Sequence, residues 1–574
     1  MFRAYVLSAD VSIDKNQDRV LSDDEISEVT EIDVTKMGIS SLKGIEYFTA
    51  LMTLDCSRNQ LTELDVSSNS ALMTLDCSSN QLTTLDISNN TVLGMLGCGY
   101  NQLTALDVSS NAFLTYLEFT SNDLTEIDVS NNINLTALGF NENHLTMLDV
   151  SKNTALEMLD CSGNQLTTLD LSNNTALTYL ECGSNQLTTL DLSNNPLLIS
   201  LSCSNNQLTS LNVSGCSALY ELWCSSNDLT ALDVSGCSAL SDLWCYSNQL
   251  TTLDVSKNTD LKNLYCDNNQ FTALDVSKNT ALWWLGCGYN QLTALDLSSN
   301  PELSWLDCYG NQLTTLDVSK NTALTSLMCW DNDLTTLDVS KNTALSWLYF
   351  GSNDLTALDV SNNTELTSLS CGSNHLTALD VSNNTALMWL DCSSNDLTAL
   401  DVSSNTAMTW LECFGDHLTA LDVSKNTALE YLDCNTNQLS ALDVTNNSKL
   451  VDLHCHTNNI SSLNLSNNPE LMRLVCYNNK LMNLDVSSST KLVTLDCYSN
   501  DLPILDVSVN SFLDSEDFYL ASRDELYRVY RNYIAEPWSN SRFSSQNLAL
   551  PQPKASGGTA DYPYALNLNT IAAS

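Results

Sequence analysis

The residues best suited to metal chemistry lie near the start of the chain, in the segment 14–25. Oxygen-bearing residues occupy positions 1, 3, 5, 9 and 12 of an EF-hand calcium loop, and position 7 supplies a backbone carbonyl. Arg19 stands at position 6, where glycine is usual because the loop needs a positive φ there. Two interpretations stay open: a Ca²⁺ site, or a relict loop that only shields the end of the fold. The candidate ligands are Asp14, Asn16, Asp18, Val20, Ser22 and Glu25.

Cysteine is the second group that could do chemistry. Of 21 cysteines, 19 recur at one position with a period of 21 residues, and phenylalanine fills the three remaining steps. A metal site or a disulfide framework would not accept phenylalanine, so the column is predicted to be apolar packing. Cys216 and Cys237 are different, because they replace a turn asparagine in adjacent repeats. Their Cα atoms should lie about 5 Å apart, which leaves both a disulfide and two thiols open.

A row of carboxylates forms the third group. One aspartate recurs in each repeat from Asp65 to Asp506, with Asn212 and Asn464 as the exceptions. Carboxylates stacked about 5 Å apart raise each other's pKa unless something compensates. The compensation is either hydrogen bonding to backbone and hydroxyl donors at a turn or a row of weak cation sites. Asparagine at two steps favours hydrogen bonding.

Tryptophan and tyrosine gather at four positions of the repeat in the middle of the chain, where strand alternation points them to solvent. Contiguous exposed aromatic surface usually marks a binding site. Aromatic residues are also favoured on exposed strands and stack across them. Their confinement to the middle repeats favours binding. The predicted ligand-contacting residues are Trp223, Trp244, Tyr265, Trp284, Trp305, Tyr309, Trp330, Trp347, Tyr349, Trp389, Trp410 and Tyr431.

The element that positions all these residues is a repeat of 21 residues, seen clearly in 324–344. Its halves read LxxLxCxxNxL and LTxLDVSxNxxL. In a short strand at Leu327–Cys329 the two outer residues face the core and Met328 faces solvent. Twenty-two such units from 51 to 512 predict a solenoid. Two asparagines mark the turns and are expected to bond the backbone of the next coil: Asn332 and Asn342.

The repeat resembles the 21-residue class of bacterial leucine-rich repeat proteins, and among them the internalin-like surface proteins that carry a cysteine ladder. The resemblance covers 29–512. It implies an α/β solenoid, mostly parallel β with few helices, curved, with a helical N-terminal cap. It also implies that the aromatic positions line the concave face. Internalin caps resemble a degenerate EF-hand without calcium, which supports the relict interpretation of the loop.

The chain therefore divides into five predicted parts. Residues 1–28 form the EF-hand-like cap, 29–50 a junction with a degenerate first repeat, and 51–512 the 22 repeats. Residues 513–535 are expected to form a C-terminal helical cap, and 536–574 an irregular tail.

Composition narrows the function. Lys and Arg total 22 against 68 Asp and Glu, a net charge of -46, which excludes nucleic acid as a partner. The chain has no apolar run long enough to cross a bilayer. It also has no nucleophile–base set, phosphate loop or zinc spacing, so an enzyme is not expected.

We expect a non-enzymatic, monomeric, adhesin-like recognition protein that is secreted or displayed on a cell surface, although this chain carries no signal peptide. It would bind a protein or carbohydrate through the aromatic band, and Ca²⁺ at the N-terminal loop is the one cofactor considered. The alternative is a structural or self-assembling solenoid without a specific ligand.

Overall fold

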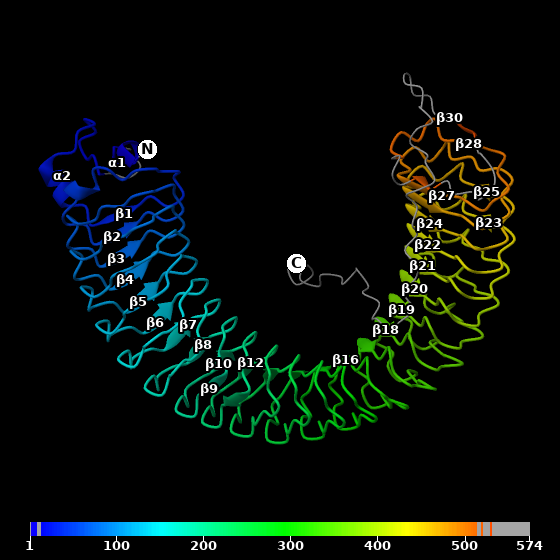
Figure 1. Ribbon diagram of the computed structural model, residues 1–574, viewed down its shortest axis with the longest axis horizontal. Helices are drawn as coiled ribbons and strands as arrows, with labels where there is room; N and C mark the ends of the chain where they lie inside the picture. Colours follow the sequence, from blue (N-terminus) through cyan, green and yellow to red (C-terminus); the bar gives the residue numbers. More distant parts are fainter. Residues whose placement is uncertain (1, 8–12, 514–517, 520–527, 531–574) are drawn as a thin grey trace, which may run out of the picture. The chain divides into compact units, whose positions relative to one another are not determined.

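The computed structural model describes residues 2–7, 13–513, 518–519 and 528–530. Apart from Tyr530, the residues described below belong to the compact unit Met1–Val529. The repeats form stacked coils, and each coil adds one short strand to the same side (Figure 1). No helix among the described residues is long or apolar enough to cross a bilayer.

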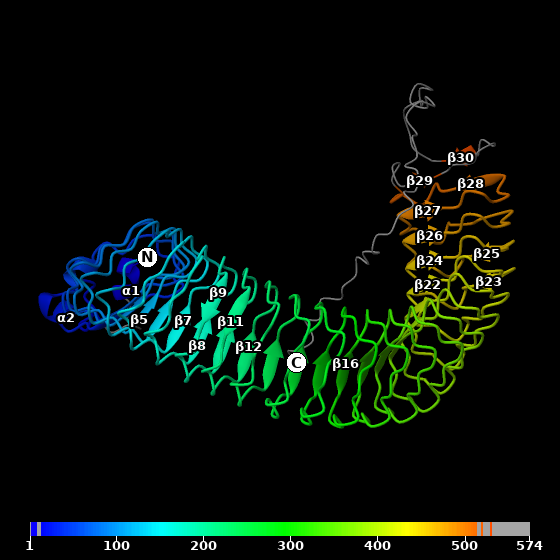
Figure 2. The same ribbon diagram turned by 60° about the horizontal axis from the view of Figure 1, so that its bottom comes forward.

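The strands of the first half-repeats form one large parallel sheet, which has 24 strands in the described residues. Neighbouring coils pair in register, so that Leu285 lies opposite Leu306, and Figure 2 shows such strands side by side. This pairing confirms the predicted solenoid of parallel strands. The strands are β1 (Glu31–Asp33), β2 (Thr53–Asp55), β3 (Thr74–Asp76), β4 (Met95–Gly97), β5 (Tyr116–Glu118), β6 (Ala137–Gly139), β7 (Met158–Asp160), β8 (Tyr179–Glu181), β10 (Ser200–Ser202), β12 (Glu221–Trp223), β13 (Asp242–Trp244), β14 (Asn263–Tyr265), β15 (Trp284–Gly286), β16 (Trp305–Asp307), β17 (Ser326–Met328), β18 (Trp347–Tyr349), β19 (Ser368–Ser370), β20 (Trp389–Asp391), β21 (Trp410–Glu412), β22 (Tyr431–Asp433), β24 (Asp452–His454), β26 (Arg473–Val475), β27 (Thr494–Asp496) and β29 (Phe518–Tyr519).

Short strands also occur in the second half of some repeats. These are β9 (Thr189–Asp191) with β11 (Ser210–Asn212), and β23 (Leu442–Asp443) with β25 (Leu463–Asn464), each pair parallel. Two more strands are β28 (Ile504–Asp506) and β30 (Arg528–Tyr530).

The core runs through the middle of every coil. In β17 and the residue after it, Leu327 and Cys329 are fully buried, and Met328 between them points outward. The cysteine ladder is buried throughout, as the packing interpretation predicts. Phe119 and Phe140 replace cysteine in adjacent coils and stack their rings 5.5 Å apart inside the column. Each fully buried leucine contributes roughly 2 kcal/mol of hydrophobic free energy, repeated coil after coil.

Two asparagine ladders close the turns, and each bonds the preceding coil. Asn332 donates its side-chain amide to the carbonyls of Cys308 (3.0 Å) and Cys329 (3.2 Å), and its Oδ1 accepts from the Leu313 N–H (3.0 Å). In the second ladder, Asn342 also donates to two carbonyls, but its Oδ1 has no hydrogen-bond partner among the residues that the structure describes. The second ladder therefore needs only a donor.

That requirement explains Cys216 and Cys237. Both are buried free thiols, and each donates to a carbonyl of the preceding coil, Leu192 O at 3.3 Å and Val213 O at 3.5 Å. Ser489 fills the same ladder position and donates from its hydroxyl. The structure thus places thiols, not a disulfide, at Cys216 and Cys237.

The two ends of the solenoid differ. The N-terminal cap contains α1 (Phe2–Val6), α2 (Asp23–Ser27) and the 3-10 turn η1 (Ile45–Tyr47). The buried ring of Phe2 meets Phe48 edge-on at 6.4 Å, which covers the first coil. At the other end, the helix expected within 513–535 lies largely outside the described residues. The described parts of that segment are the short strands β29 and β30, and the helical cap stays a prediction.

Candidate ligand-binding face

Strand alternation places the predicted aromatic residues on one face. In β15, Leu285 is fully buried, whereas Trp284 and Gly286 flank it on the outer side. Ten of the twelve predicted side chains belong to strands between β12 and β22, and Tyr309 and Trp330 lie two residues beyond the ends of β16 and β17. We call the outer side of β12 to β22, with these twelve side chains, the aromatic face.

A continuous ring stack begins this face. Trp223 contacts Trp244 with ring centroids 5.2 Å apart, and Trp244 stacks on Tyr265 at 5.1 Å with an interplanar angle of 9°. Tyr265 then contacts Trp284 at 5.4 Å, and Trp284 stacks on Trp305 at 4.2 Å. The rings thus run across five consecutive strands at the spacing of the coils.

The stack crosses β17, a strand that carries no ring. Trp305 and Trp347 lie two strands apart, yet their centroids are only 5.5 Å apart. They lean together over Ser326, which is fully buried and whose hydroxyl has no hydrogen-bond partner within the described part of the chain. Trp347 is the most exposed ring of the stack, at 39%.

A second, shorter cluster lies beside the first. Tyr309 stacks on Trp330 at 4.7 Å with an angle of 5°, and Tyr289 meets both rings edge-on. Tyr309 lies flat against the neighbouring strand because residue 288 is glycine: a Cβ there would come within 2.6 Å of the tyrosine ring.

The far end of the face is packed differently from the prediction. Adjacent strands carry Trp389 and Trp410, and the interpretation of the rings as sheet packing expects them to stack, as Trp284 and Trp305 do. Instead, Trp389 meets Tyr349 edge-on at 5.7 Å, and Trp410 stacks on Tyr431 at 3.7 Å. The expected direct stack fails because each ring leans toward an aromatic neighbour on its other side.

Three further rings extend this face and were not predicted from the sequence. His456 stacks on Tyr477 at 4.2 Å, and Tyr477 stacks on Tyr498 at 4.4 Å. All three occupy the seventh position of their repeats, the position also held by Tyr309 and Trp330. That shared position was the signal available in the sequence.

Ring stacking also changes what the face presents. The sequence predicts solvent-exposed rings, but most of the twelve are only partly exposed because each ring covers its neighbour. Neighbouring rings therefore cover most of the flat faces of the aromatic rings. Ring edges are exposed instead, whereas the indole N–H of Trp284 is buried and those of Trp305 and Trp410 donate to the carboxylates of Asp307 and Glu412.

Two carboxylates lie beneath the first stack. Asp267 folds over Gly286 and accepts a hydrogen bond from the Gly288 N–H at 2.8 Å; a Cβ on Gly286 would come within 2.5 Å of its Oδ2. Asp307 accepts from the indole N–H of Trp305 at 2.9 Å. Burial raises the pKa of Asp267 to about 6, and burial together with repulsion from Asp267 raises the pKa of Asp307 to about 7.

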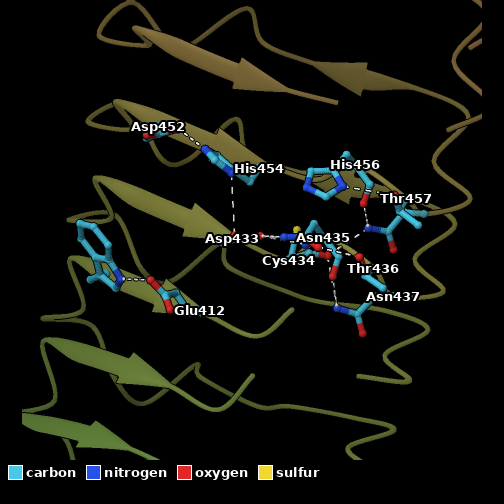
Figure 3. A network of polar contacts seen from close by, with 12 residues as sticks. Glu412, Asp433, Cys434, Asn435, Thr436, Asn437, Asp452, His454, His456 and Thr457 are labelled. Atoms are coloured by element: carbon cyan, nitrogen blue, oxygen red, sulfur yellow. Dashed lines mark hydrogen bonds and ion pairs between the residues drawn. The ribbon is translucent and has the colours of Figure 1, made fainter. Parts of the chain in front are cut away.

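A second acidic group lies at the far end of the face (Figure 3). Glu412 accepts from the indole N–H of Trp410 at 2.9 Å, and burial raises its pKa to about 7. His454 forms ion-pair contacts with Asp452 (2.8 Å) and with the buried Asp433 (3.8 Å). Burial likewise raises the pKa of Asp433.

The aspartate row lies in the second half of each repeat. The pKa values of its carboxylates are shifted in the opposite direction from those of the buried carboxylates on the aromatic face. Asp338 accepts from the Ser340 N–H at 2.9 Å, and this pairing recurs along the row. Asn212 and Asn464 accept from serine in the same way, so hydrogen bonding is the compensation. These bonds hold the pKa of all twenty aspartates below the ordinary value.

Five of the predicted calcium ligands lie in the loop that precedes α2, and the sixth, Glu25, lies in the first turn of α2. Asp14 and Glu25 are buried, at 4% and 7% exposure, whereas the other four candidates are exposed. Hydrogen bonds from Ser22 hold the pKa of Glu25 below its ordinary value. Over the part of the chain that the structure describes, no three His, Cys, Asp or Glu side chains converge as a ready metal site.

The stacked coils, parallel sheet and asparagine turns define a leucine-rich repeat protein, and solved structures agree. The functional domain of InlJ from Listeria monocytogenes, which includes a cysteine ladder, is 34% identical, with a TM-score of 0.52 over 67% of this chain and 78% of that domain. The chain belongs to the internalin-like leucine-rich repeat proteins with a cysteine ladder.

Two more distant structures share the fold alone. YopM from Yersinia enterocolitica is 23% identical, with a TM-score of 0.52 over 83% of this chain and 88% of that one. The plant peptide hormone receptor RGFR1, in complex with RGF2, is 19% identical, with a TM-score of 0.69 over 85% and 91%. No protein-family model and no curated protein sequence matches the chain.

Proposed function

We propose that this chain is a non-enzymatic recognition protein that binds a protein ligand through the aromatic face. The observation that carries the proposal is the ring stack of Trp223 to Trp305, which runs over five neighbouring strands on the solvent side of the sheet. Tryptophan and tyrosine dominate the energetically important positions of protein interfaces.

The fold itself does not need these rings. Thr53, Thr74 and Ala137 occupy the strand position that Trp284 fills in β15, and their coils pair in the same register. Ser326 and Ser368 fill it even within the aromatic face. Serine, threonine and alanine at this position therefore suffice to form the solenoid. The concentration of aromatic rings in β12 to β22 is not explained by folding alone.

The geometry favours a protein over a sugar. Carbohydrate rings bind to open aromatic faces, but here neighbouring rings cover most of those faces. What remains is a broad surface of ring edges, which suits the aromatic and apolar side chains of a protein partner. RGFR1, which shares the fold, was solved in complex with RGF2. A rigid sheet also loses little conformational entropy on binding.

By its likeness to internalin-like proteins, we propose a monomer that acts outside the cell, secreted or at the cell surface, in an adhesin-like role. The test is a screen of the purified chain against arrays of cell-surface proteins and glycans. The matched variant is Trp347→Ser with Trp389→Ser, because serine already occupies this position in other strands. An exposed aromatic outside the face, Phe113→Ser, is the control.

Protein binding that the double variant loses and the control keeps supports the proposal. Glycan binding with the same pattern would support the aromatic face as the binding site but change the class of ligand. Binding that survives in the double variant contradicts the proposal. Concentration-dependent self-association of the wild type without any ligand would favour the alternative, a self-assembling solenoid.

A further inference from the structure

We propose that the loop 14–25 of the N-terminal cap binds one Ca²⁺ ion and that the ion fastens the cap to the first coil. The observation that carries this proposal is the side chain of Asp14. It is only 4% exposed, and its Oδ1 has no hydrogen-bond partner among the described residues. A buried carboxylate oxygen without a partner is costly, and a bound cation removes that cost.

The Asp14 carboxylate points into the loop. Its other oxygen, Oδ2, accepts a hydrogen bond from the Arg19 N–H five residues later, at 2.8 Å. This contact requires the chain to turn back around the carboxylate. Arg19 has a φ of 67°, so the backbone already has the left-handed conformation that a calcium loop needs at this position. The arginine that weakens the sequence match therefore does not change the path of the loop.

The remaining candidate ligands line the same turn. Asn16 Oδ1 accepts from the Asp18 N–H at 2.9 Å, and Asp18 Oδ1 accepts from the Val20 N–H at 2.8 Å. These contacts hold oxygen atoms of positions 3 and 5 close to the loop backbone. Together with the Val20 carbonyl and the Ser22 hydroxyl, they offer the neutral and charged oxygen ligands that Ca²⁺ takes.

Glu25 closes the loop from its other end. Its Oε1 accepts from the Lys15 N–H at 2.9 Å, and its Oε2 accepts from the N–H and hydroxyl of Ser22 at 2.9 and 2.8 Å. The carboxylate thus already spans the start and end of the loop. Because three acidic side chains do not converge in this arrangement, we infer that Glu25 exchanges part of these hydrogen bonds for the cation.

The donor set selects the ion. Every candidate atom is oxygen, and no nitrogen or sulfur ligand takes part, which favours a hard cation over zinc. Mg²⁺ demands a tighter octahedral shell and gives up its water reluctantly, so an irregular loop favours Ca²⁺.

The location gives the ion a structural role. The loop directly follows Ile13, which is buried with Phe2 and Val6 in the core that covers the first coil. An ion held by Asp14 and Glu25 would tie the start of the loop to α2. It would thereby resist fraying at the apolar end of the solenoid.

The test uses the full chain, freed of cations with a chelator and then titrated with Ca²⁺ by calorimetry at physiological ionic strength. Hydrogen exchange is measured in parallel, because the many exposed acidic groups also attract Ca²⁺ weakly. We expect one tight site per chain and slower exchange confined to residues 13–28. Asp14→Asn and Glu25→Gln should each weaken binding by about tenfold or more, since each removes a charged ligand.

Asp24→Asn is the matched control, because Asp24 is exposed on α2 and outside the ligand set. It should bind Ca²⁺ within about twofold of the wild type. Circular dichroism checks that each variant keeps its sheet, and the exchange experiment on the wild type does not depend on any variant. The proposal is overturned if exchange at 13–28 does not respond to Ca²⁺, or if Asp24→Asn weakens binding as much as Glu25→Gln. Equal protection by Mg²⁺ at the same concentration would overturn the choice of ion.

Discussion

Replacing Asp416 with asparagine should stabilise the protein, and more so at alkaline pH. Asp416 occupies a ladder position that is asparagine in the neighbouring coils, where Asn395 donates to the carbonyls of Cys371 and Cys392 at 3.0 Å each. Asp416 still accepts from the Asn395 N–H, but an ionised carboxylate cannot donate. Asp416 is 4% exposed, and its Oδ2 has no hydrogen-bond partner over the described ranges of the chain.

The size of the effect follows from the bonds restored. The side-chain amide introduced by the substitution would donate to two carbonyls, and each such bond contributes about 1 kcal/mol. Asp416→Asn should therefore raise the free energy of unfolding by about 2 kcal/mol. Relief of the partly screened, buried charge adds to this gain.

The pH dependence has a definite sign. Burial raises the pKa of Asp416 to about 7 in the folded protein, above its ordinary value of 3.8. Between these two values the folded state holds a proton that the unfolded state has lost. The contribution of Asp416 to stability therefore falls as pH rises from about 4 to about 7, and it is lowest above that window. The asparagine variant lacks this proton, so its advantage should be larger at about pH 8 than at about pH 5.

The assay is urea unfolding at both pH values, with hydrogen exchange over coils 392–437 to locate the change. The reverse substitution Asn374→Asp is the matched control, because Asn374 makes the same ladder bonds. It should destabilise, and more at high pH. A gain from Asp416→Asn that is absent, or equal at both pH values, would refute this reasoning.

Three further outcomes are expected. Cys287→Asp should unfold neighbouring coils, since it places an unpaired charge in the fully buried ladder, and it should abolish the cooperative transition seen by circular dichroism; a well-folded variant would contradict the inward assignment. Asp307→Asn should raise the melting temperature at about pH 8 but much less at about pH 5, because burial and Asp267 raise the pKa of Asp307 to about 7; an equal shift at both values argues against a buried carboxylate. Asp338→Ala should lower the melting temperature more than Asp338→Asn, since asparagine keeps the acceptor for the Ser340 N–H; equal losses would show that charge, not hydrogen bonding, matters in the row.

The periodic part of the fold could be predicted from the sequence. One position per repeat is cysteine or phenylalanine, and alternation in a three-residue strand decides which neighbours face the core. Leu327, Met328 and Cys329 lie as that rule requires. The aspartate row was also open to prediction, because asparagine at Asn212 and Asn464 revealed a hydrogen-bonding role.

The packing of the aromatic face could not be predicted in the same way. Alternation fixes the side of the sheet but not the direction in which a ring leans. Trp305 and Trp347 meet over the small Ser326, whereas Trp389 and Trp410 turn away from each other. The orientation of each ring depends on which neighbouring residues are small and which are aromatic. Because these neighbours lie on several strands, the sequence of a single repeat does not determine the orientation.

The central claim is that the aromatic face binds a protein ligand. It is tested most directly by measuring the affinity of the wild type, of Trp347→Ser with Trp389→Ser, and of Phe113→Ser for a protein identified in the screen. The structure predicts that the double variant keeps its fold and loses at least about tenfold in affinity. Tryptophans that become buried against a partner contribute most of the binding energy of an interface. Phe113→Ser should bind as the wild type does. Unchanged affinity in the double variant would contradict the claim and leave the rings as packing of the sheet.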